Sequence, residues 1–405
     1  MRILVQKFGG TSVSSPEARE AAFRHIRRAL DEDYALVVVV SAMGRKGDPY
    51  ATDTLLGLLA PYASSVSARE RDLLLSCGEI ISAAVMCGLL QSRGIPAAAF
   101  TGEQAGIFTN GDFGNARITK VAADRLMEHL SAGKVAVVAG FQGAAGNGDI
   151  TTLGRGGSDT TAAALGAALG AEFVDIFTDV DGVLTADPRL VSDAKPLAYV
   201  TYAEICNMAN NGAKVIHPRA VEIAMEAGVP VRIRSTFSDG LGTLVSAPSK
   251  LGGRGVRERV ITAIAHSPEA AQIRVFAGGE PIDLQLQVFR EMANCGISVD
   301  LINVNPSEVA FTVSDAEADR AAERLKAIGC EPSVVRHCTK VSVIGGGMNG
   351  VPGIMAAVVE ALAAEGIAIL QSADSNTTIW VLVEARDTVK AVNALHRKFR
   401  LHVQD

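Results

Sequence analysis

The chain has 405 residues, enough for two to four domains of ordinary size. Its 38 Lys and Arg residues against 44 Asp and Glu give a net charge of −6, which argues against a protein that coats nucleic acid. Hydrophobic residues make up 48% of the chain and charged residues 20%, which is typical of a folded globular protein and excludes a largely disordered one.

Strand and helix patterns alternate over the first 245 residues. Residues 2–8 predict a strand, and residues 16–31 predict a helix that Ser14 caps. Continuous apolar runs, typical of strands buried on both faces of a parallel sheet, occupy residues 35–42, 135–141 and 173–178. Ligands of such sheets lie beyond the carboxyl ends of the strands, so we expect the chemistry there.

Two glycine-rich motifs stand in or near these strand ends. Lys7-Phe8-Gly9-Gly10-Thr11-Ser12 combines a lysine, which can neutralise a phosphoryl group, with glycines that let the backbone approach a phosphate. Residues 154–161 place Arg155 between glycines, where a guanidinium can hold a carboxylate at two points. For the first motif, the alternative is an ordinary strand-to-helix turn. For the second, the alternative is that Ser158 or Asp159 only caps the following helix.

Three weaker signals accompany these motifs. Acidic and turn residues cluster in residues 177–183 and 185–189, where a solvated turn is the alternative. Lys214 either reaches a phosphate or stays a surface lysine. Glu79 lies at an expected helix start, where it either complements the helix dipole or holds a substrate ammonium group.

The C-terminal part of the chain follows a Gly-, Ser- and Arg-rich stretch and repeats itself. With an offset of 70 residues, Gly296-Ile297 aligns with Gly366-Ile367. Each copy predicts the ferredoxin-like order βαββαβ, so we expect two small modules packed side by side. Residues 345–350 match GxGxxG, but a module of this size lacks the sheet of a dinucleotide-binding fold, which disfavours NAD.

Cysteine and histidine residues predict no catalytic or metal site. The six cysteines are scattered without a CxxC pair, as in reduced buried thiols, and the histidines are too dispersed for a zinc site. The continuous apolar runs are shorter than the roughly 20 residues of a bilayer span, and the N-terminus has no signal-peptide pattern. We therefore expect a cytoplasmic enzyme that binds neither membranes nor nucleic acid.

Three motifs in this order resemble the aspartate kinases of the amino-acid kinase family: KFGGTS, GRGGSDT, and FTDVDGV followed by TADPR. The resemblance covers essentially the whole chain. It implies an α/β fold: an amino-acid-kinase three-layer sandwich with a mostly parallel central sheet, followed by two ferredoxin-like ACT domains. The implied segments are a catalytic domain (1–245), a linker (246–259) and two ACT-like domains (260–337 and 338–405), residues 260–266 belonging to either of the last two.

The resemblance also implies an activity, which is phosphorylation of the β-carboxylate of L-aspartate by ATP with Mg²⁺, the first step towards lysine, diaminopimelate, threonine and methionine. It implies catalytic roles for Lys7 and Asp159, while the metal ligands stay unassigned. The implied aspartate-binding residues are Thr52, Glu79, Phe141, Arg155, Gly156 and Ser158. The implied nucleotide-binding residues are Lys7, Gly9, Gly10, Thr178, Asp179, Arg189 and Lys214.

Regulation and assembly follow from the same resemblance. Paired ACT domains imply feedback by an end-product amino acid and a homodimer or larger assembly. The sequence of residues 41–48 and the chain length resemble the short monofunctional Bacillus-type, diaminopimelate-sensitive enzymes. Residues 279–283 and 371–376 differ from the loop sequences that are usual in the family. We therefore favour meso-diaminopimelate as effector over lysine or threonine, with Gln371, Asp374 and Ser375 as contacts.

Two other functions fit parts of the sequence. A kinase of another carboxylate, such as acetylglutamate or glutamate, would share the first motifs, but the two C-terminal repeats argue against it. A non-catalytic amino-acid sensor would be expected to lose Lys7 or Asp159, and the chain has both.

Overall fold

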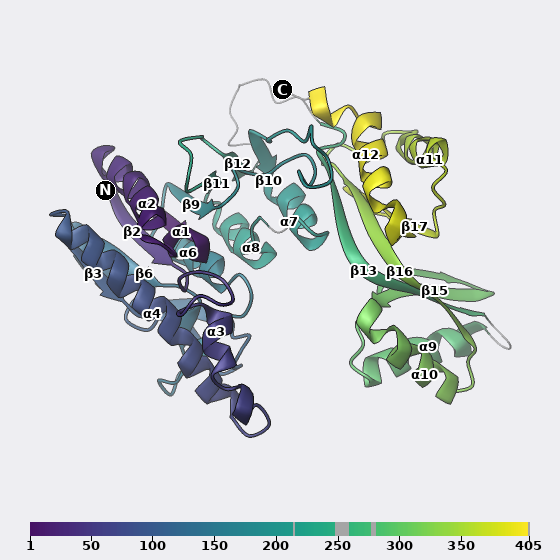
Figure 1. The fold of residues 1–405 in the computed structure, drawn as a ribbon, viewed down its shortest axis with the longest axis horizontal. Coiled ribbons are helices and arrows are strands. Elements are labelled where there is room, and N and C mark those ends of the chain that lie inside the picture. Colours follow the sequence, from purple (N-terminus) through teal and green to yellow (C-terminus); the bar gives the residue numbers. More distant parts are fainter. Residues whose placement is uncertain (214, 248–258, 277–280, 404–405) are drawn as a thin grey trace. The chain divides into compact units, whose positions relative to one another are not determined.

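The computed structural model describes residues 1–213, 215–247, 259–276 and 281–403, which form two compact units (Figure 1). The N-terminal unit comprises residues 1–183 and 196–209 and the described residues of 215–247. The C-terminal unit comprises 184–195, 210–213 and 259–403. Two short segments before residue 245 thus belong to the C-terminal unit, and most of the expected linker lies outside the described residues.

An eight-stranded sheet forms the centre of the N-terminal unit. Its order is β10-β12-β11-β9-β1-β2-β6-β3, and its neighbours are parallel except β11 and β12. The strands are β1 (Arg2–Phe8), β2 (Tyr34–Val40), β3 (Ala97–Phe100), β6 (Val135–Ala139), β9 (Phe173–Thr178), β10 (Tyr199–Thr201), β11 (Val231–Ser235) and β12 (Thr243–Ser246). The predicted mostly parallel sheet is confirmed, with strand ends that differ by one or two residues.

Helices cover both faces of this sheet. Leu36 and Val38 of β2 pack in one core with α2 (Pro16–Asp31) and α4 (Ala68–Ser92), while α5 (Asp124–Ser131) and α6 (Gly157–Ala168) contact the same sheet and complete the sandwich. The remaining helices are α1 (Gly10–Val13), α3 (Thr52–Gly57), η1 (Ala60–Tyr62), α7 (Tyr202–Asn210) and α8 (Pro218–Ala227). A small sheet of order β5-β4-β7-β8 joins β4 (Ile107–Thr109), β5 (Ile118–Val121), β7 (Gln142–Ala144) and β8 (Ile150–Thr152).

Two local expectations need correction. The helix at Pro16–Asp31 begins where predicted, but its cap is Ser15, whose Oγ accepts the N–H of Ala18 at 3.1 Å. The Ser14 hydroxyl instead donates to the Thr11 carbonyl. The Gly-Gly turn leads into the single turn of α1, so α2 starts only after a break.

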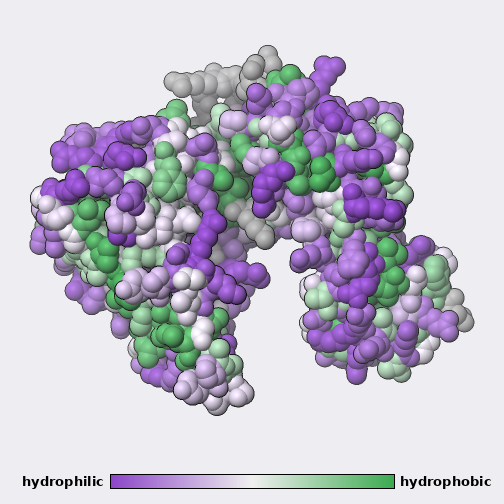
Figure 2. All heavy atoms as spheres, in the orientation of Figure 1, coloured by the Kyte–Doolittle hydropathy of each residue, from purple (hydrophilic) through white to green (hydrophobic). Residues whose placement is uncertain are grey.

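Helix α4 is long and apolar enough to cross a membrane by length and composition alone. Half of its apolar window is buried, and it packs on β3, β6 and β8, as expected for the core helix of a folded domain. Figure 2 shows hydrophobic side chains on the surface at the end of the unit where α3 lies. The exposed large side chains of this region are Tyr50, Leu56, Leu58, Tyr62 and Leu73.

The C-terminal unit is built on one six-stranded antiparallel sheet of order β14-β15-β13-β16-β18-β17. Its strands are β13 (Ala263–Phe276), β14 (Asp300–Asn305), β15 (Glu308–Ser314), β16 (Pro332–Ile344), β17 (Gln371–Asp374) and β18 (Thr378–Glu384). Its helices are α9 (Pro281–Asn294), η3 (Asp315–Glu317), α10 (Ala318–Ala327), α11 (Ile354–Ala364), η4 (Ala385–Asp387), α12 (Thr388–Lys398) and η5 (Leu401–Val403). In Figure 1, α9 and α10 lie at one end of the long strands β13 and β16, and α11 and α12 at the other.

The internal repeat is real at the level of the backbone. Gly296 and Gly366 end α9 and α11 with φ values of 65° and 70°, and the next residue donates to the fifth carbonyl before it in both copies. The two copies nevertheless share one sheet. The first half of β13, Ala263–Ser267, pairs with the second half of β16, and so supplies the fourth strand of the second copy.

The GxGxxG match has a packing explanation. It follows β16, whose neighbours β13 and β18 are both antiparallel, whereas a dinucleotide fingerprint requires a parallel βαβ unit. A Cβ on Gly345 would lie 1.9 Å from the carbonyl oxygen of Val260, so close backbone packing requires this glycine. The match at residues 345–350 is therefore not a dinucleotide-binding fingerprint.

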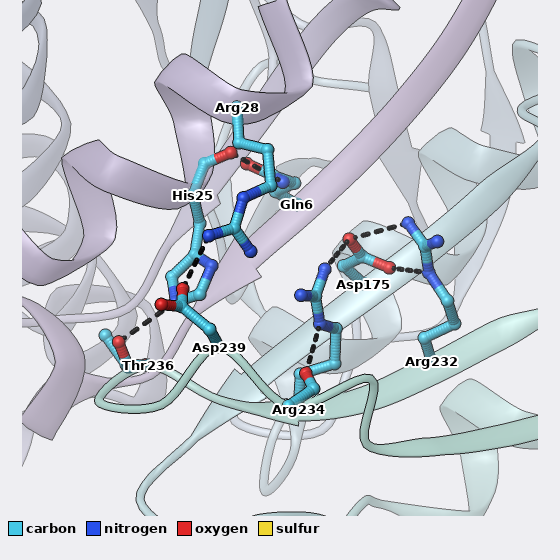
Figure 3. Close-up of polar contacts among 9 residues, drawn as sticks. Gln6, His25, Arg28, Asp175, Arg232, Arg234, Thr236 and Asp239 are labelled. Atoms are coloured by element: carbon cyan, nitrogen blue, oxygen red, sulfur yellow. Dashed lines mark hydrogen bonds and ion pairs between the residues drawn. The ribbon is translucent and has the colours of Figure 1, made fainter. Parts of the chain in front are cut away.

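A polar network supports one part of the N-terminal sheet (Figure 3). The carboxylate of Asp175 on β9 is fully buried and accepts hydrogen bonds from Arg232 at 2.5 and 2.9 Å and from Arg234 at 3.5 Å. His25 on α2 reaches the chain just after β11, where its Nε2 lies 3.0 Å from the carbonyl oxygen of Thr236. Both contacts hold β11 in place, next to the strand that ends in Thr178.

We expect stability to decrease when the pH falls below about 6.5. Burial lowers the pKa of His25, whereas an unfolded histidine has a pKa of about 6.5 and takes up its proton first. Stability from this residue is therefore complete above that pH and decreases below it, by at most about 1.4 kcal/mol per pH unit. Urea unfolding at several pH values measures the slope, which His25→Gln should reduce.

His129, which is partly exposed and lies outside this network, gives the matched control for this prediction. His129→Gln should leave the acid-side slope of the unfolding free energy as in the parent protein. An equal reduction of that slope by both substitutions would show that His25 has no special part in the pH dependence.

Candidate active site

A cavity of about 540 Å³ lies at the carboxyl end of β1, between α4 and the start of α6. Its lining includes eight of the residues expected at the site: Lys7, Thr52, Glu79, Phe141, Arg155, Gly156, Ser158 and Asp159. These residues come from separate parts of the chain, and the parallel order of the sheet brings their elements to one edge.

An ion pair joins the first two motifs inside this cavity. Lys7 Nζ lies 2.7 Å from Asp159 Oδ1, and each side chain is 12% exposed. Asp159 belongs to the first turn of α6, whose N-cap is Gly156, and none of the described side chains caps this helix. The alternative of Ser158 or Asp159 as helix cap is therefore wrong. The carboxylate instead fixes the lysine ammonium at the end of β1.

Glu79 adds a buried carboxyl group to the cavity lining. It lies in the middle of α4, so the expectation of a helix start at residues 76–79 is wrong. Its Oε1 accepts the N–H of Ala42 at 3.0 Å, while Oε2 has no hydrogen-bond partner among the residues that the structure describes. Burial raises the pKa of Glu79 to about 8, although the bond from Ala42 opposes this shift.

Arg155 is exposed at the cavity and forms no ion pair within the described part of the chain. Its guanidinium is therefore available to an anionic ligand. Gly156 adopts φ 67°, and a Cβ there would lie 2.1 Å from His217 Cβ, so this turn requires glycine. Phe141 has φ 70°, an uncommon conformation for a non-glycine residue. Two hydrogen bonds hold it: its N–H donates to Thr161 Oγ1, and its carbonyl accepts from the N–H of Leu153.

Among the expected nucleotide-binding residues, the two glycines differ in what the fold demands of them. A Cβ on Gly10 would lie 2.7 Å from the Gly44 carbonyl oxygen, so packing alone explains this glycine. A Cβ on Gly9 would make ordinary contacts, the closest being 3.5 Å from Lys7 Nζ. The fold therefore does not require Gly9, and its missing side chain keeps the space beside the Lys7 ammonium open.

Of the other expected nucleotide-binding residues, those that the structure describes are not part of the cavity lining. Thr178 ends β9 and its hydroxyl donates to Asp179, which pairs with Arg45 at 2.6 Å. Arg189 lies on the segment that belongs to the C-terminal unit and pairs with Asp187 at 2.7 Å. Lys214 lies outside the described residues.

Four further residues of the cavity region were not among the predicted site residues: Ser41, Arg71, Asp72 and His217. Asp72 is fully buried on α4, and its carboxylate accepts hydrogen bonds from the N–H groups of Gly114 and Thr152 and from the Thr152 hydroxyl, at 2.7–2.9 Å. It thereby fixes two loops of the cavity wall. The N–H of His217 lies 3.4 Å from Asp159 Oδ2.

The expected effector residues all lie on or after β17 in the C-terminal unit. Gln371 is buried, donates to the Leu301 carbonyl and accepts a hydrogen bond from Gln272 at 2.8 Å. Asp374 is exposed. The Ser375 hydroxyl accepts the N–H of Thr378 at 3.1 Å within the turn before β18.

Comparison with known proteins agrees with this geometry. Residues 2–235 match the amino acid kinase family, and residues 333–397 match the ACT domain. The chain is 56% identical to aspartokinase 1 of Bacillus subtilis over 403 residues, which are 99% of this chain and 100% of that protein.

Two solved structures of one relative also match over the whole chain. E. coli aspartokinase III in complex with aspartate and ADP has a TM-score of 0.79 at 28% identity, over 98% of this chain and 99% of that one. Its complex with lysine and aspartate has a TM-score of 0.76 at 27% identity, with the same coverage. The protein belongs to the amino acid kinase family and, within it, to the aspartokinases.

Proposed function

We propose that the protein transfers the γ-phosphoryl group of ATP to the β-carboxylate of L-aspartate in the cavity described above, giving 4-phospho-L-aspartate and ADP. The observation that carries this proposal is the placement of four ionisable side chains around one cavity: the Lys7–Asp159 pair, Arg155 and Glu79. The 56% identity to an aspartokinase over the full length supports aspartate as the substrate over another carboxylate. It also supports an active kinase over a non-catalytic sensor.

Each of these side chains has a distinct role in this proposal. The free guanidinium of Arg155 binds the α-carboxylate, because arginine holds a carboxylate at two points. Ser158 adds a hydrogen bond from its hydroxyl, and Glu79 binds the α-ammonium through its unpartnered Oε2. Lys7 then faces the β-carboxylate and the γ-phosphate, which are both anionic.

The chemistry needs charge neutralisation more than proton transfer. The β-carboxylate is ionised at neutral pH and is already a nucleophile, so no general base is required. Catalysis then rests on aligning two anions and cancelling their repulsion. Lys7 supplies a positive charge at the transferring group, and Asp159 positions the lysine.

We propose that Mg²⁺ accompanies the nucleotide and neutralises its phosphates when bound. The cavity offers three carboxyl groups, of which Asp72 is saturated by three hydrogen bonds and Glu79 faces the substrate side. Asp159 Oδ2 has one long contact, 3.4 Å from the His217 N–H, and is the oxygen that fits a cation. One carboxylate plus phosphate oxygens is a common Mg²⁺ environment.

We also propose that the C-terminal unit binds an end-product amino acid, with meso-diaminopimelate favoured and with Gln371, Asp374 and Ser375 near the effector. The sequences of residues 41–48 and 371–376 support meso-diaminopimelate as the effector. A homodimer or larger assembly through the ACT domains is supported by the edge strand β14, which exposes Ile302 (49%) and Val304 (42%). The composition supports a cytoplasmic location.

Trapping the acyl phosphate as a hydroxamate tests the activity. We expect ATP-dependent hydroxamate from L-aspartate and none from L-glutamate, with Mg²⁺ supplied. Folded protein that forms no hydroxamate from aspartate would contradict the proposed reaction. The same assay with lysine, threonine and meso-diaminopimelate added singly, and with lysine and threonine together, identifies the effector, and inhibition by lysine or threonine alone would contradict diaminopimelate.

A further inference from the structure

The described residues bring together one group of potential metal ligands, and all of its members belong to the C-terminal unit. Asp193, His396 and His402 each offer one donor atom, and these atoms lie within 4.8 Å of one another. Asp193 belongs to residues 184–195, which contribute Ala186 and Val191 to the core beside α12. The sequence pattern predicted no zinc site because these residues lie far apart along the chain.

His396 on α12 is the central member of the group. It is completely buried, and its Nε2 lies 2.9 Å from Thr185 Oγ1. Its Nδ1 lies 3.8 Å from Asp193 Oδ1 and has no hydrogen-bond partner among the described residues, and neither has the buried Nδ1 of His402. Two buried ring nitrogens without partners are unusual, because leaving such groups unsatisfied costs stability.

We propose that Asp193, His396 and His402 bind a divalent transition-metal cation of the Zn²⁺ type through one carboxylate oxygen and two imidazole nitrogens. Zinc takes such ligands at about 2.0–2.2 Å, which places neighbouring donors about 3.3 Å apart in a tetrahedral site. The observed 3.8 Å between His396 and Asp193 needs only a small side-chain movement to reach that spacing.

The surroundings fit a metal ligand set. When the Thr185 hydroxyl accepts the Nε2 proton, the Nδ1 lone pair of His396 is left facing the group, which is the usual outer contact of a metal-bound histidine. Burial also lowers the pKa of His396, which favours the neutral ring that a metal requires. Asp193 is half exposed, so a cation can enter from solvent and keep a water in the fourth position.

Such a cation would fasten residues 184–195 to the C-terminal helix. These residues come after β9 and residues 179–183 along the chain, and they include Arg189, one of the expected nucleotide-binding residues. The proposal is independent of the kinase activity, because its ligands are not residues of the proposed active site.

Zinc binding to the full chain tests the site. After removal of metals by chelation, we expect one Zn²⁺ per chain in competition with a chelating dye of roughly micromolar affinity. Asp193→Asn and His402→Asn should each weaken binding at least about tenfold. Excess Zn²⁺ should raise the melting temperature of the wild type by about 3–6 °C and leave that of these variants unchanged.

Matched controls come from the same unit. Asp319→Asn and His337→Asn remove exposed groups of the same chemistry outside the site and should bind zinc as the wild type does. Equal zinc binding by wild type, Asp193→Asn and His402→Asn would assign the metal to other groups, such as thiols, and overturn the proposal. Absence of zinc binding to the wild type would overturn it as well.

Discussion

Lys7→Ala is expected to lower kcat by about 10³-fold while the KM for aspartate changes by less than about threefold. The Lys7 ammonium is fixed by Asp159 at 2.7 Å, so its charge is already in place before the phosphoryl group moves. A preorganised charge that meets developing negative charge contributes mainly to the transition state, and losing one such contact costs several kcal/mol. Aspartate itself is bound by Arg155 and Glu79 in the proposed site, so its affinity should survive.

Steady-state kinetics with the hydroxamate assay measures this effect, and thermal unfolding checks the fold, because the substitution leaves Asp159 without its partner. Lys120→Ala, which removes an exposed lysine of the same unit, is the control and should leave kcat unchanged. A Lys7→Ala enzyme with wild-type kcat would remove Lys7 from the reaction.

The partner residue gives a second check on the same mechanism. Asp159→Asn keeps the lysine but loosens its position, so kcat should fall less than in Lys7→Ala. Because the two side chains act as one unit, the double variant should be little worse than Lys7→Ala alone. If the fall in kcat of the double variant equalled the product of the two single falls, Asp159 would act through a group other than Lys7.

The strands of the kinase fold could be predicted because they are buried on both faces. Continuous apolar runs such as Leu36–Val40 leave few other choices, and the structure confirms them. The ends were harder to predict. The expected strand at 135–141 stops at Ala139, because Phe141 adopts a positive φ that a strand does not allow.

The arrangement of the C-terminal unit could be predicted only in part. The repeat predicted the order of elements, yet it could not show that β13 and β16 are long enough to serve both copies in one sheet. Nor could local pattern place residues 184–195 in this unit, since Ala186 and Val191 look like any apolar residues of an α/β domain. Both features depend on contacts between distant segments.

The candidate site shows the same limit. Glycine-rich motifs pointed to the residues around Lys7 and Arg155, because glycine clusters are rare without a backbone reason. Asp72 was missed because it lies in a helix without a motif. A signal existed nonetheless: Asp72 and Glu79 are seven residues apart, so helical periodicity puts both acids on the buried face that also carries Leu75 and Ala83.

Glu79 leads to the second large effect, a pH dependence of aspartate binding. Burial raises the pKa of Glu79 to about 8 in the free protein, so the carboxyl group is mostly neutral at pH 7. Only the ionised form attracts the α-ammonium of aspartate. We therefore expect kcat/KM for aspartate to rise about five- to tenfold between about pH 7 and 8.5, following the ionisation of the free enzyme.

Glu79→Gln separates this residue from other titrating groups. The amide has nearly the same shape but never carries a charge, so kcat/KM should be lower by about 10- to 100-fold at about pH 8.5 and should lose most of its rise with pH. Glu70→Gln changes an exposed acid at the start of the same helix and should keep the wild-type profile. A wild-type profile that is flat across this range, or a rise that persists in Glu79→Gln, would contradict the role of Glu79.

The direction of the effect also distinguishes two roles for the buried acid. A Glu79 that served only to hold the Ala42 N–H would accept that bond in either protonation state, and its ionisation would leave aspartate affinity unchanged. A Glu79 that binds the substrate ammonium has its pKa lowered by the bound charge, so proton release accompanies aspartate binding near neutral pH. Calorimetry in buffers of different ionisation enthalpy measures that proton release, which should approach one proton per aspartate at about pH 7 and vanish in Glu79→Gln.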